Sequence, residues 1–365
     1  MTHKTARNHG LELWTIFDRI EEAYDAGMRV ENRMKTEIFG TFGPACDSEE
    51  ILRQMIEAGM TGMRLNLSHT TLFESKAIVE KYQNEACAMG IKPQILIDMQ
   101  GPELRVGELK APIILEENDR VCVSEDDLGE GQIPMPREVI EALAVNDEIL
   151  LDDGKILVRV TGVASDTKRF EVLVVRGGIL HSHKSIKIIG KNISLPPLTD
   201  HDIANIKVAK EYGVTALMQP FVSSGTQLQQ VRSVLKEHGV EQIQVFAKIE
   251  NRLGLEKIED ILSEADVIIV ARGDLGNDMP LWELPKVQKQ IEEACHKAKK
   301  PYIIVTQMLA SMEKSPVPTR AEVSDIYHAV YHGAWGVMLT GETAVGAYPV
   351  EAIRYLANTA REAEE

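Results

Sequence analysis

The sequence predicts an α/β protein, a (β/α)8 TIM barrel with an inserted antiparallel β lid domain and an N-terminal helix. Short apolar runs alternate with amphipathic helices from Thr36 onward, a rhythm typical of parallel α/β folds. The rhythm stops at a β-rich stretch and then resumes. The two alternating segments, 36–105 and 186–365, together hold about 250 residues, the usual size of such a barrel. A doubly wound open sheet is the alternative.

Residues 1–35 carry apolar residues at near-helical spacing, with charged residues between them. We expect a helix there that packs on the main body or on a partner subunit. The stretch lacks the apolar core of a secretory signal, and no run in the chain reaches the roughly 20 apolar residues of a membrane helix.

Composition limits the partners of the protein. The four cysteines have no CxxC spacing, which indicates reduced thiols in a cytoplasmic protein. The net charge of −16 argues against binding to nucleic acid. It also means that an anionic substrate needs a local cluster of cations or a metal.

The first barrel segment holds three strands and two helices. We expect strands at 38–44, 61–69 and 93–105, and helices at 48–59 and 71–90. Asp47 is the predicted N-cap of the first helix, with acidic residues in the turn that follows it.

Residues 106–185 differ from the rest of the chain. Four β-rich runs, VCVS, EILLDD, KILVRVTGV and FEVLVVRGG, are separated by turn signals such as DDGK and SDTK. This pattern predicts an inserted β-barrel domain. It leaves the barrel from the end of the third strand, so we expect it to act as a lid.

The second barrel segment supplies the other five strands. We expect them to end near Val222, Glu250, Asp274, Met308 and Glu342. Helices are predicted at 200–213, 225–239, 254–264, 284–300, 319–333 and 349–365.

Polar side chains mark the end of the second strand. Arg64, Asn66 and Ser68 are two residues apart, so they share one face. A buried arginine needs an anion, which is either a protein carboxylate or a ligand phosphate. Asn66 and Ser68, with Asp98 at the end of the third strand, could surround a monovalent cation. Ordinary hydrogen bonding is the alternative.

The strand–helix–strand unit 245–276 carries the strongest signal. Lys248 and Glu250 point the same way from one strand, and Asp274 follows the next strand. Active sites of α/β folds lie at such carboxyl ends. Two carboxylates with few other ligands suit Mg²⁺ or Mn²⁺. The alternative is an ion pair, either Lys248–Glu250 or Arg272–Asp274.

Further groups complete the predicted site. Lys248 could neutralise a developing enolate or phosphoryl oxygen. Gly273 and Asp274 are expected in a tight turn whose N–H groups could hold a carboxylate, and Thr306 offers a hydroxyl. The residues indicate a barrel enzyme acting on an enol, enolate or phosphate of a keto acid. They leave kinase, aldolase and decarboxylase open.

Seven stretches, in this order, resemble the signature stretches of the pyruvate kinase family over roughly residues 36–365. They are RLNLSH, DMQGPELR, AKIEN, VARGDLG, TQMLASM, PTRAEVSD and LTGETAVGAYPVEA. The resemblance implies phosphoryl transfer from phosphoenolpyruvate to ADP, giving pyruvate and ATP, in a cytoplasmic homo-oligomer.

The resemblance also implies roles for single residues. Lys248 would stabilise the transferring phosphoryl group and the enolate, and Arg64 would contact the phosphoryl group. Glu250 and Asp274 would bind Mg²⁺, Gly273 and Asp274 the substrate carboxylate, and Thr306 would lie near the carbon that is protonated. The implied K⁺ ligands are Asn66, Ser68, Asp98 and the Met99 carbonyl, with Glu103 as the form of the motif that goes with K⁺. The implied nucleotide-site residues are Thr41, Pro44, His69, Arg105 and Lys184.

The sequence departs from the family at several places. Met99 and Gln100 stand where the family has Thr-Lys, Pro220 and Ser223 where it has Ser and Arg, and Val345 where it has Lys. Residues 181–190 also differ, and we expect the family's C-terminal domain, with its sugar-phosphate effector site, to be absent. Two alternatives follow: a paralogue using the same Mg²⁺–enolate site on another keto acid or acceptor, as a lyase or specialised kinase, or a non-catalytic member.

Overall fold

The computed structural model describes residues 36–365 except 69, 103, 126–131, 153, 164–168, 192 and 194. The helix expected over residues 1–35 lies outside these described residues. The chain forms two compact units: the residues up to Gly101 together with Pro197–Glu365, and Pro102–Pro196. The second unit starts four residues before and ends eleven residues after the 106–185 assigned to it from sequence.

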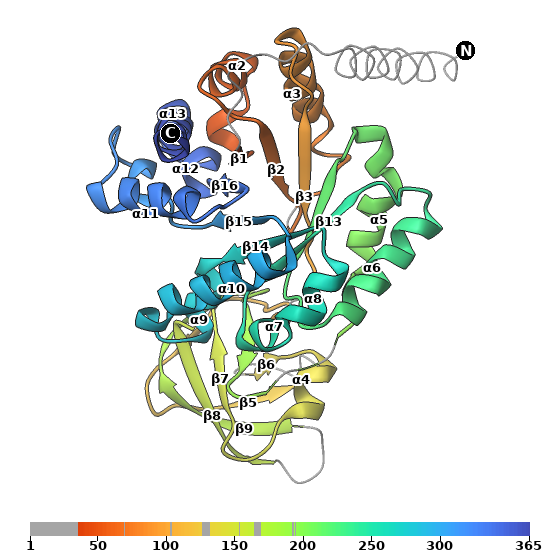
Figure 1. Ribbon diagram of the computed structural model, residues 1–365. Coiled ribbons are helices and arrows are strands. Elements are labelled where there is room, and N and C mark those ends of the chain that lie inside the picture. The colour runs from red at the N-terminus through yellow and green to blue at the C-terminus, as the bar shows by residue number, and fades with distance from the viewer. Residues whose placement is uncertain are drawn as a thin grey trace. The chain divides into compact units, whose positions relative to one another are not determined.

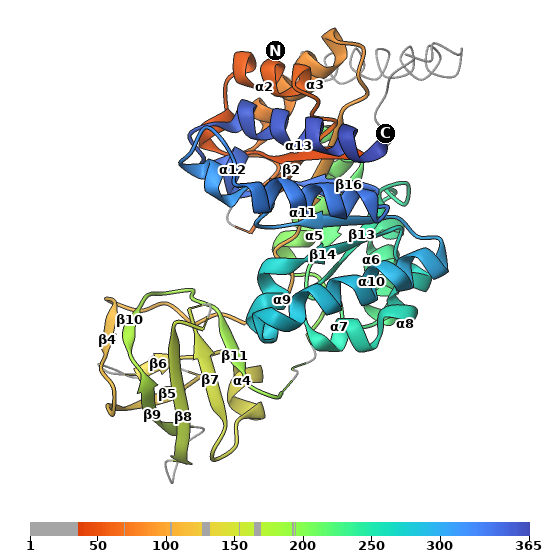
Figure 2. The ribbon, with the colours of Figure 1, turned by 60° about the vertical axis from the view of Figure 1, so that its left-hand side comes forward.

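The first unit is a closed barrel of eight parallel strands (Figures 1 and 2). The ring runs β1–β2–β3–β12–β13–β14–β15–β16 and back to β1. This confirms the predicted barrel, and the alternative of an open doubly wound sheet is wrong. The strands are β1 (Glu37–Thr41), β2 (Gly62–Asn66), β3 (Gln94–Asp98), β12 (Ala216–Gln219), β13 (Gln244–Ile249), β14 (Val267–Ala271), β15 (Tyr302–Val305) and β16 (Gly336–Met338).

Helices connect the strands around the outside of the barrel (Figure 1). The longer ones are α2 (Glu49–Glu57), α3 (Lys76–Ala88), α5 (Asp200–Val208), α6 (Gly225–Glu237), α10 (Leu284–Ala298), α11 (Arg320–Tyr331) and α13 (Pro349–Glu364). The shorter ones are α7 (Arg252–Glu256), α8 (Ile258–Glu264), α9 (Arg272–Asp278), α12 (Gly341–Ala344) and the 3₁₀ turns η1 (Pro44–Cys46), η2 (Ala209–Tyr212), η3 (Leu281–Glu283) and η4 (Ala310–Glu313).

Two details of the helices differ from the sequence prediction. Ser48, not Asp47, is the N-cap of α2, and its side chain accepts a hydrogen bond from the Ile51 N–H. The helix predicted over 254–264 is divided into α7 and α8, with Lys257 between them. Asn251 caps α7 by accepting from the Gly254 N–H at 2.8 Å, so the helical region also begins earlier than its apolar spacing indicates.

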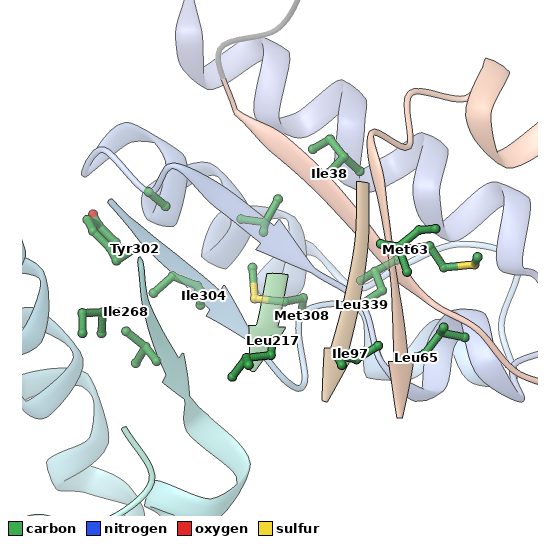
Figure 3. Close-up of a cluster of buried hydrophobic side chains, with 14 of the residues drawn as sticks. Ile38, Met63, Leu65, Ile97, Leu217, Ile268, Tyr302, Ile304, Met308 and Leu339 are labelled. Carbon is green, nitrogen blue, oxygen red and sulfur yellow. The ribbon is translucent and has the colours of Figure 1, made fainter. Parts of the chain in front are cut away.

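Alternation along the strands divides the apolar core into two layers. Outward residues pack under the helices, as Figure 3 shows for ten labelled side chains that include Leu65, Ile97 and Leu217. Inward residues fill the barrel, among them Phe39 and Phe246, whose rings both contact Trp335. Every second residue of a strand therefore belongs to the interior, as a barrel strand requires.

The second unit is built from β strands and one helix. A six-stranded sheet has the order β11–β7–β8–β9–β5–β6, and β10 pairs with β4. Most pairs are antiparallel, as predicted, but β5 and β6 are parallel. Among the described residues these are two sheets, where a β-barrel was expected. The elements are β4 (Ile113–Leu115), β5 (Arg120–Ser124), β6 (Gln132–Pro134), α4 (Arg137–Ala142), β7 (Glu148–Leu151), β8 (Ile156–Val163), β9 (Arg169–Arg176), β10 (Gly178–Leu180) and β11 (Ile186–Ile188).

Two further observations bear on the sequence predictions. All four cysteines are unpaired thiols, and Cys46 and Cys295 are buried. Within the described ranges, no helix combines the length and the apolar character needed to cross a membrane.

Candidate active site

The last inward positions of four barrel strands are polar. Thr41, Arg64, Asp98 and Lys248 stand two residues beyond inward Phe39, Gly62, Leu96 and Phe246 on their strands. Because parallel strands share one direction, these side chains form one layer at the carboxyl end of the barrel. The chain therefore closes the apolar interior with charged groups at the end where barrel enzymes carry their active sites.

Lys248 lies between two carboxylates. Its Nζ is 2.9 Å from Glu250 Oε1 and 3.3 Å from Asp98 Oδ1. The side chains of the two acids are 1% and 4% exposed, and that of Lys248 is 14% exposed. The Lys248–Glu250 ion pair considered from sequence is therefore present, and Asp98 is a second partner that spacing did not indicate.

Arg64 also binds Asp98. Its Nη2 and Nε donate to Asp98 Oδ2 at 2.6 and 3.0 Å, and its Nη1 donates to Thr41 Oγ1 at 3.1 Å. Of the two anions considered for Arg64, a protein carboxylate is the one observed. The Arg64 side chain remains 13% exposed, so it is not fully enclosed by its protein partners.

Burial and charge act differently on the two acids. Burial raises the pKa of Asp98, but the charges of Lys248 and Arg64 outweigh it and hold the pKa below its ordinary value. Glu250 has one cation instead of two and lies near Asp274, so burial raises its pKa to about 7. The pKa of Lys248 is raised, because Asp98 and Glu250 outweigh the cost of its burial. Lys248 and Asp98 are thus fixed as ions, whereas Glu250 titrates near neutral pH.

Glu250 has the properties of a metal ligand. Its Oε2 accepts the Phe221 N–H at 2.6 Å, and its Oε1 faces Lys248 Nζ at 2.9 Å. A buried carboxylate pairs with a cationic side chain or coordinates a metal. Asp274, which is half-buried, is close enough to raise the pKa of Glu250. The donor set, two carboxylates, fits Mg²⁺ or Mn²⁺.

Glu250 and Asp274 are a small set of protein ligands for a metal ion. No group of three or more His, Cys, Asp or Glu in the described ranges is arranged to hold a metal. Ions such as Mg²⁺ commonly take only one or two protein carboxylates and complete their shell with water and substrate. The two carboxylates are thus enough for that mode of binding.

Arg272 has a different partner from the one considered from sequence, and it also contacts Thr306. Arg272 forms an ion pair with Asp325, at 2.7 Å, so the Arg272–Asp274 pair is wrong. Its Nε and Nη2 also donate to the Thr306 carbonyl oxygen at 3.2 and 2.8 Å. Thr306 has a φ of 73°, which is unfavourable for a β-branched residue. The guanidinium therefore holds Thr306 in a conformation that it rarely adopts.

Gly273 and Asp274 lie in the first turn of a helix, α9, which begins at Arg272, so the predicted tight turn is wrong. The Gly273 N–H donates to Thr306 Oγ1 at 2.7 Å, and this hydroxyl donates to the Val305 carbonyl at 2.6 Å. The structure thus brings Thr306 and Gly273 together at neighbouring strand ends. A ligand carboxylate would have to compete with the Thr306 oxygen for this N–H group.

The four residues expected to bind K⁺ are only partly assembled. Asn66 and Asp98 are register partners on β2 and β3, but the Asp98 carboxylate is bound by Arg64 and Lys248. Asn66 Oδ1 accepts the Ser68 N–H at 3.2 Å. The buried side chain of Met99 packs in the outer core layer. The potassium site therefore stays a prediction, as does the role of Glu103, which lies outside the described residues.

The expected nucleotide residues belong to both units. Thr41 is buried and Pro44 is exposed in the barrel unit, whereas His69 lies outside the described residues. A cavity of about 410 Å³ lies beside η1 and α3, with Gly43, Asn66 and Lys81 in its lining. In the other unit, Lys184 Nζ is 2.9 Å from Asp152 Oδ1, and Arg105 donates to the His183 carbonyl. A nucleotide site formed by these residues stays a prediction.

Sequence reasoning missed a buried carboxylate next to the site. Asp202, which is 0% exposed, accepts the Gln100 N–H at 2.8 Å and the Gly101 N–H at 3.0 Å. It also forms a capping box with Thr199 at the start of α5. The signal was present in the sequence, because Thr199 and Asp202 have the spacing of a capping box. The side chain of Gln100 accepts from Thr199 Oγ1 at 3.1 Å.

The fold and the site define a (β/α)8-barrel protein with buried acidic and basic side chains at the carboxyl ends of its strands. The profile of the family described as pyruvate kinase, barrel domain, matches residues 33–353. The chain therefore belongs to the pyruvate kinase family.

Individual proteins agree with this assignment. A pyruvate kinase of Bacillus licheniformis is 38% identical over 339 residues, covering 91% of this chain and 57% of that protein. One of Thermococcus litoralis is 38% identical, covering 91% of this chain and 70% of that protein. The crystal structure of a pyruvate kinase from Cryptosporidium parvum superimposes with a TM-score of 0.83 at 31% identity, covering 91% of this chain and 70% of that one. The chain thus spans little more than half the length of several relatives.

Proposed function

We propose that the protein transfers the phosphoryl group of phosphoenolpyruvate to ADP, giving pyruvate and ATP, with Mg²⁺ or Mn²⁺ and K⁺ as cofactors. The observation that carries the proposal is the buried cluster of Lys248, Glu250, Asp98 and Arg64 at the carboxyl end of a barrel of this family. Phosphoryl transfer depends mainly on positioning and on neutralising charge, and this cluster is built for both.

Each residue of the cluster has a part in the proposal. Lys248 is held as a cation by two carboxylates, so it can neutralise the transferring phosphoryl group and the enolate without changing its own charge. Arg64 is fixed by Asp98 and is 13% exposed, so it would bind a phosphoryl oxygen in a set orientation. Thr306, next to Gly273, would lie near the carbon that is protonated.

The divalent cation would be held by Glu250 and Asp274. When bound, it supplies Lewis-acid polarisation of the keto-acid oxygens and neutralises the substrate carboxylate. Gly273 and Asp274 would contribute backbone N–H groups to that carboxylate. The nucleotide would take residues from the set Thr41, Pro44, His69, Arg105 and Lys184.

A second candidate function rests on Gln100. The amide of this side chain is bound by Thr199 and its backbone by Asp202, where the family resemblance implies a lysine. A neutral side chain at this position would change the charge presented to the substrate. This observation favours the same metal and lysine machinery acting on another keto acid or another phosphoryl acceptor.

A coupled assay with phosphoenolpyruvate, ADP, Mg²⁺ and K⁺ tests the proposal. Steady formation of pyruvate supports the first function. Without turnover, Mn²⁺-dependent binding of oxalate, an enolate mimic, would support the second. If neither signal is found, both are wrong.

We also propose a cytoplasmic homo-oligomer without nucleic-acid partners. Four unpaired thiols suit a reducing compartment, and the net charge of −16 opposes binding to polyanions. Light scattering on the purified protein measures the oligomeric state directly.

A further inference from the structure

The end of β12 carries a buried polar side chain that the proposed reaction does not use. Gln219 points away from the barrel interior and is 1% exposed. Its Nε2 donates to the Pro197 carbonyl oxygen at 2.6 Å, while its Oε1 has no hydrogen-bond partner in the described ranges. Pro197 is the first residue of the barrel unit after the inserted unit. Gln219 thus binds the point where the chain returns to the barrel.

The next residue, Pro220, packs on the point where the chain leaves the barrel. Gly101, the last barrel residue before the inserted unit, has a φ of 64°, and a Cβ added to it would lie 2.3 Å from Pro220 Cγ. Only glycine combines this conformation with this contact. The N–H group of Gly101 is bound by Asp202. The proline and the aspartate therefore enclose the outgoing crossing.

The third residue reaches the proposed metal carboxylate. Phe221 has a φ of 52° and donates its N–H to Glu250 Oε2 at 2.6 Å. Lys248 Nζ contacts the other carboxylate oxygen, Oε1, at 2.9 Å, so the Phe221 N–H is the backbone group that orients Glu250. Groups that hydrogen-bond a ligating carboxylate orient it and adjust its affinity for the ion.

We propose that Gln219, Pro220 and Phe221 form a positioning element that couples both chain crossings to the carboxylate of Glu250. Three consecutive residues contact the returning crossing, the outgoing crossing and the carboxylate, in that order. A displacement of either crossing is passed to the Phe221 N–H through a single short stretch of backbone. Because such coupling is reciprocal, cation binding at Glu250 also fixes the two crossings.

The inference rests on the proposed role of Glu250 as a metal ligand, and the test separates the two. Amide hydrogen exchange is measured with and without Mn²⁺ in the full chain, at residues 99–101 and 198–200, and Mn²⁺ affinity is measured by electron paramagnetic resonance. The variant is Gln219→Leu, which keeps the volume of the side chain and removes its donor. The control is Gln83→Leu, because Gln83 is also buried and donates to a carbonyl, that of Tyr212, at 3.0 Å.

In the wild-type protein we expect Mn²⁺ to slow exchange at both crossings. In Gln219→Leu we expect faster exchange at 198–200 without metal, loss of the Mn²⁺ response there, and Mn²⁺ affinity lower by about tenfold. Gln83→Leu should respond like the wild type. If Gln219→Leu fails to fold, Pro220→Ala gives the second test, with the loss expected at 99–101.

Different results would overturn different statements. A variant that keeps the wild-type Mn²⁺ affinity and the wild-type response at both crossings would overturn the coupling and leave the metal site intact. A response lost equally in Gln83→Leu would also overturn it, because the effect would then be general destabilisation. A wild-type protein that does not bind Mn²⁺ would overturn the proposed function itself.

Discussion

Replacing Lys248 with methionine tests the centre of the proposed site. Methionine has a similar length but no charge, so the change removes the contacts at 2.9 Å to Glu250 and at 3.3 Å to Asp98. The buried layer then holds two carboxylates and one cation, Arg64. The variant therefore changes both the stability of the free protein and the charge that the substrate meets.

The two effects have different sizes. Removing one partner of a buried ion pair costs about 3–5 kcal/mol of stability when the remaining partner stays ionised. Glu250 already has a pKa of about 7 and takes up a proton once Lys248 is gone, so the loss of stability stays below that range. Proton uptake by Glu250 does not restore the positive charge that the reaction needs. Removing a charge-stabilising donor from a preorganised site costs a factor of about 10²–10³ in kcat, or about 2.7–4 kcal/mol.

The assay is pyruvate formation from phosphoenolpyruvate and ADP, with the melting temperature measured in parallel. Lys300→Met is the matched control, because Lys300 is also partly buried, donates to the Ala265 carbonyl at 2.7 Å, and precedes β15 at the opposite end of the barrel. The control should keep its turnover. A Lys248→Met protein that is folded and turns over within about tenfold of the wild type would refute the assignment of the site.

Three further predictions follow from single contacts. Glu250 must lose its proton to bind a cation, and its pKa is raised to about 7. The affinity for Mn²⁺ should therefore be constant above that pH and fall about tenfold for each pH unit below it. A Mn²⁺ affinity that does not change from pH 6 to 8 would contradict the raised pKa. In Arg272→Lys a single ammonium replaces three nitrogens, so it cannot keep the Nη1 bonds to Asp325 together with both the Nε and Nη2 bonds to the Thr306 carbonyl. We expect kcat to fall about tenfold or more, since each lost charged bond is worth about 1.5–3 kcal/mol. Unchanged kinetics would show that Thr306 is held by other contacts. Phe246→Ala leaves a cavity in the barrel interior, where the phenyl ring contacts Trp335. Urea denaturation should show a free energy of unfolding that is lower by about 3–5 kcal/mol. A loss under about 1 kcal/mol would mean that the barrel interior closes around the cavity.

The barrel could be predicted from the sequence because its signals are local. The period of two along 245–250 places Lys248 and Glu250 on one side, and the structure brings them to 2.9 Å. Local sequence signals do not decide the outcome where two neighbouring residues suit the same role. Asp47 and Ser48 are both good N-caps, and the backbone at Ser48 decides between them. At Gly273 the glycine suggested a tight turn, but the residue lies in the first turn of helix α9.

The parts of the site that sequence could not predict depend on distant contacts. Arg272 and Asp325 are 53 residues apart in the chain, and no spacing rule connects them. Asp98 was considered as a cation ligand, yet two positive side chains from β2 and β13 take its carboxylate. The hydrogen bond from Phe221 to Glu250 is donated by the backbone N–H, so the residue type at this position does not predict it.

The pairing of β1 with β16 has a consequence for synthesis of the protein. Glu37 pairs with Gly336, so one edge of the first strand has no neighbour until the ribosome has made the last one. The inserted unit differs, because even its most distant strand partners, Ile113 and Leu180, lie closer in sequence than Glu37 and Gly336, so it can fold earlier. A chain stalled before Gly336 would carry a barrel with two open strand edges, which are templates for aggregation. We therefore expect the yield of folded protein to depend on how rapidly the final third of the chain is synthesised.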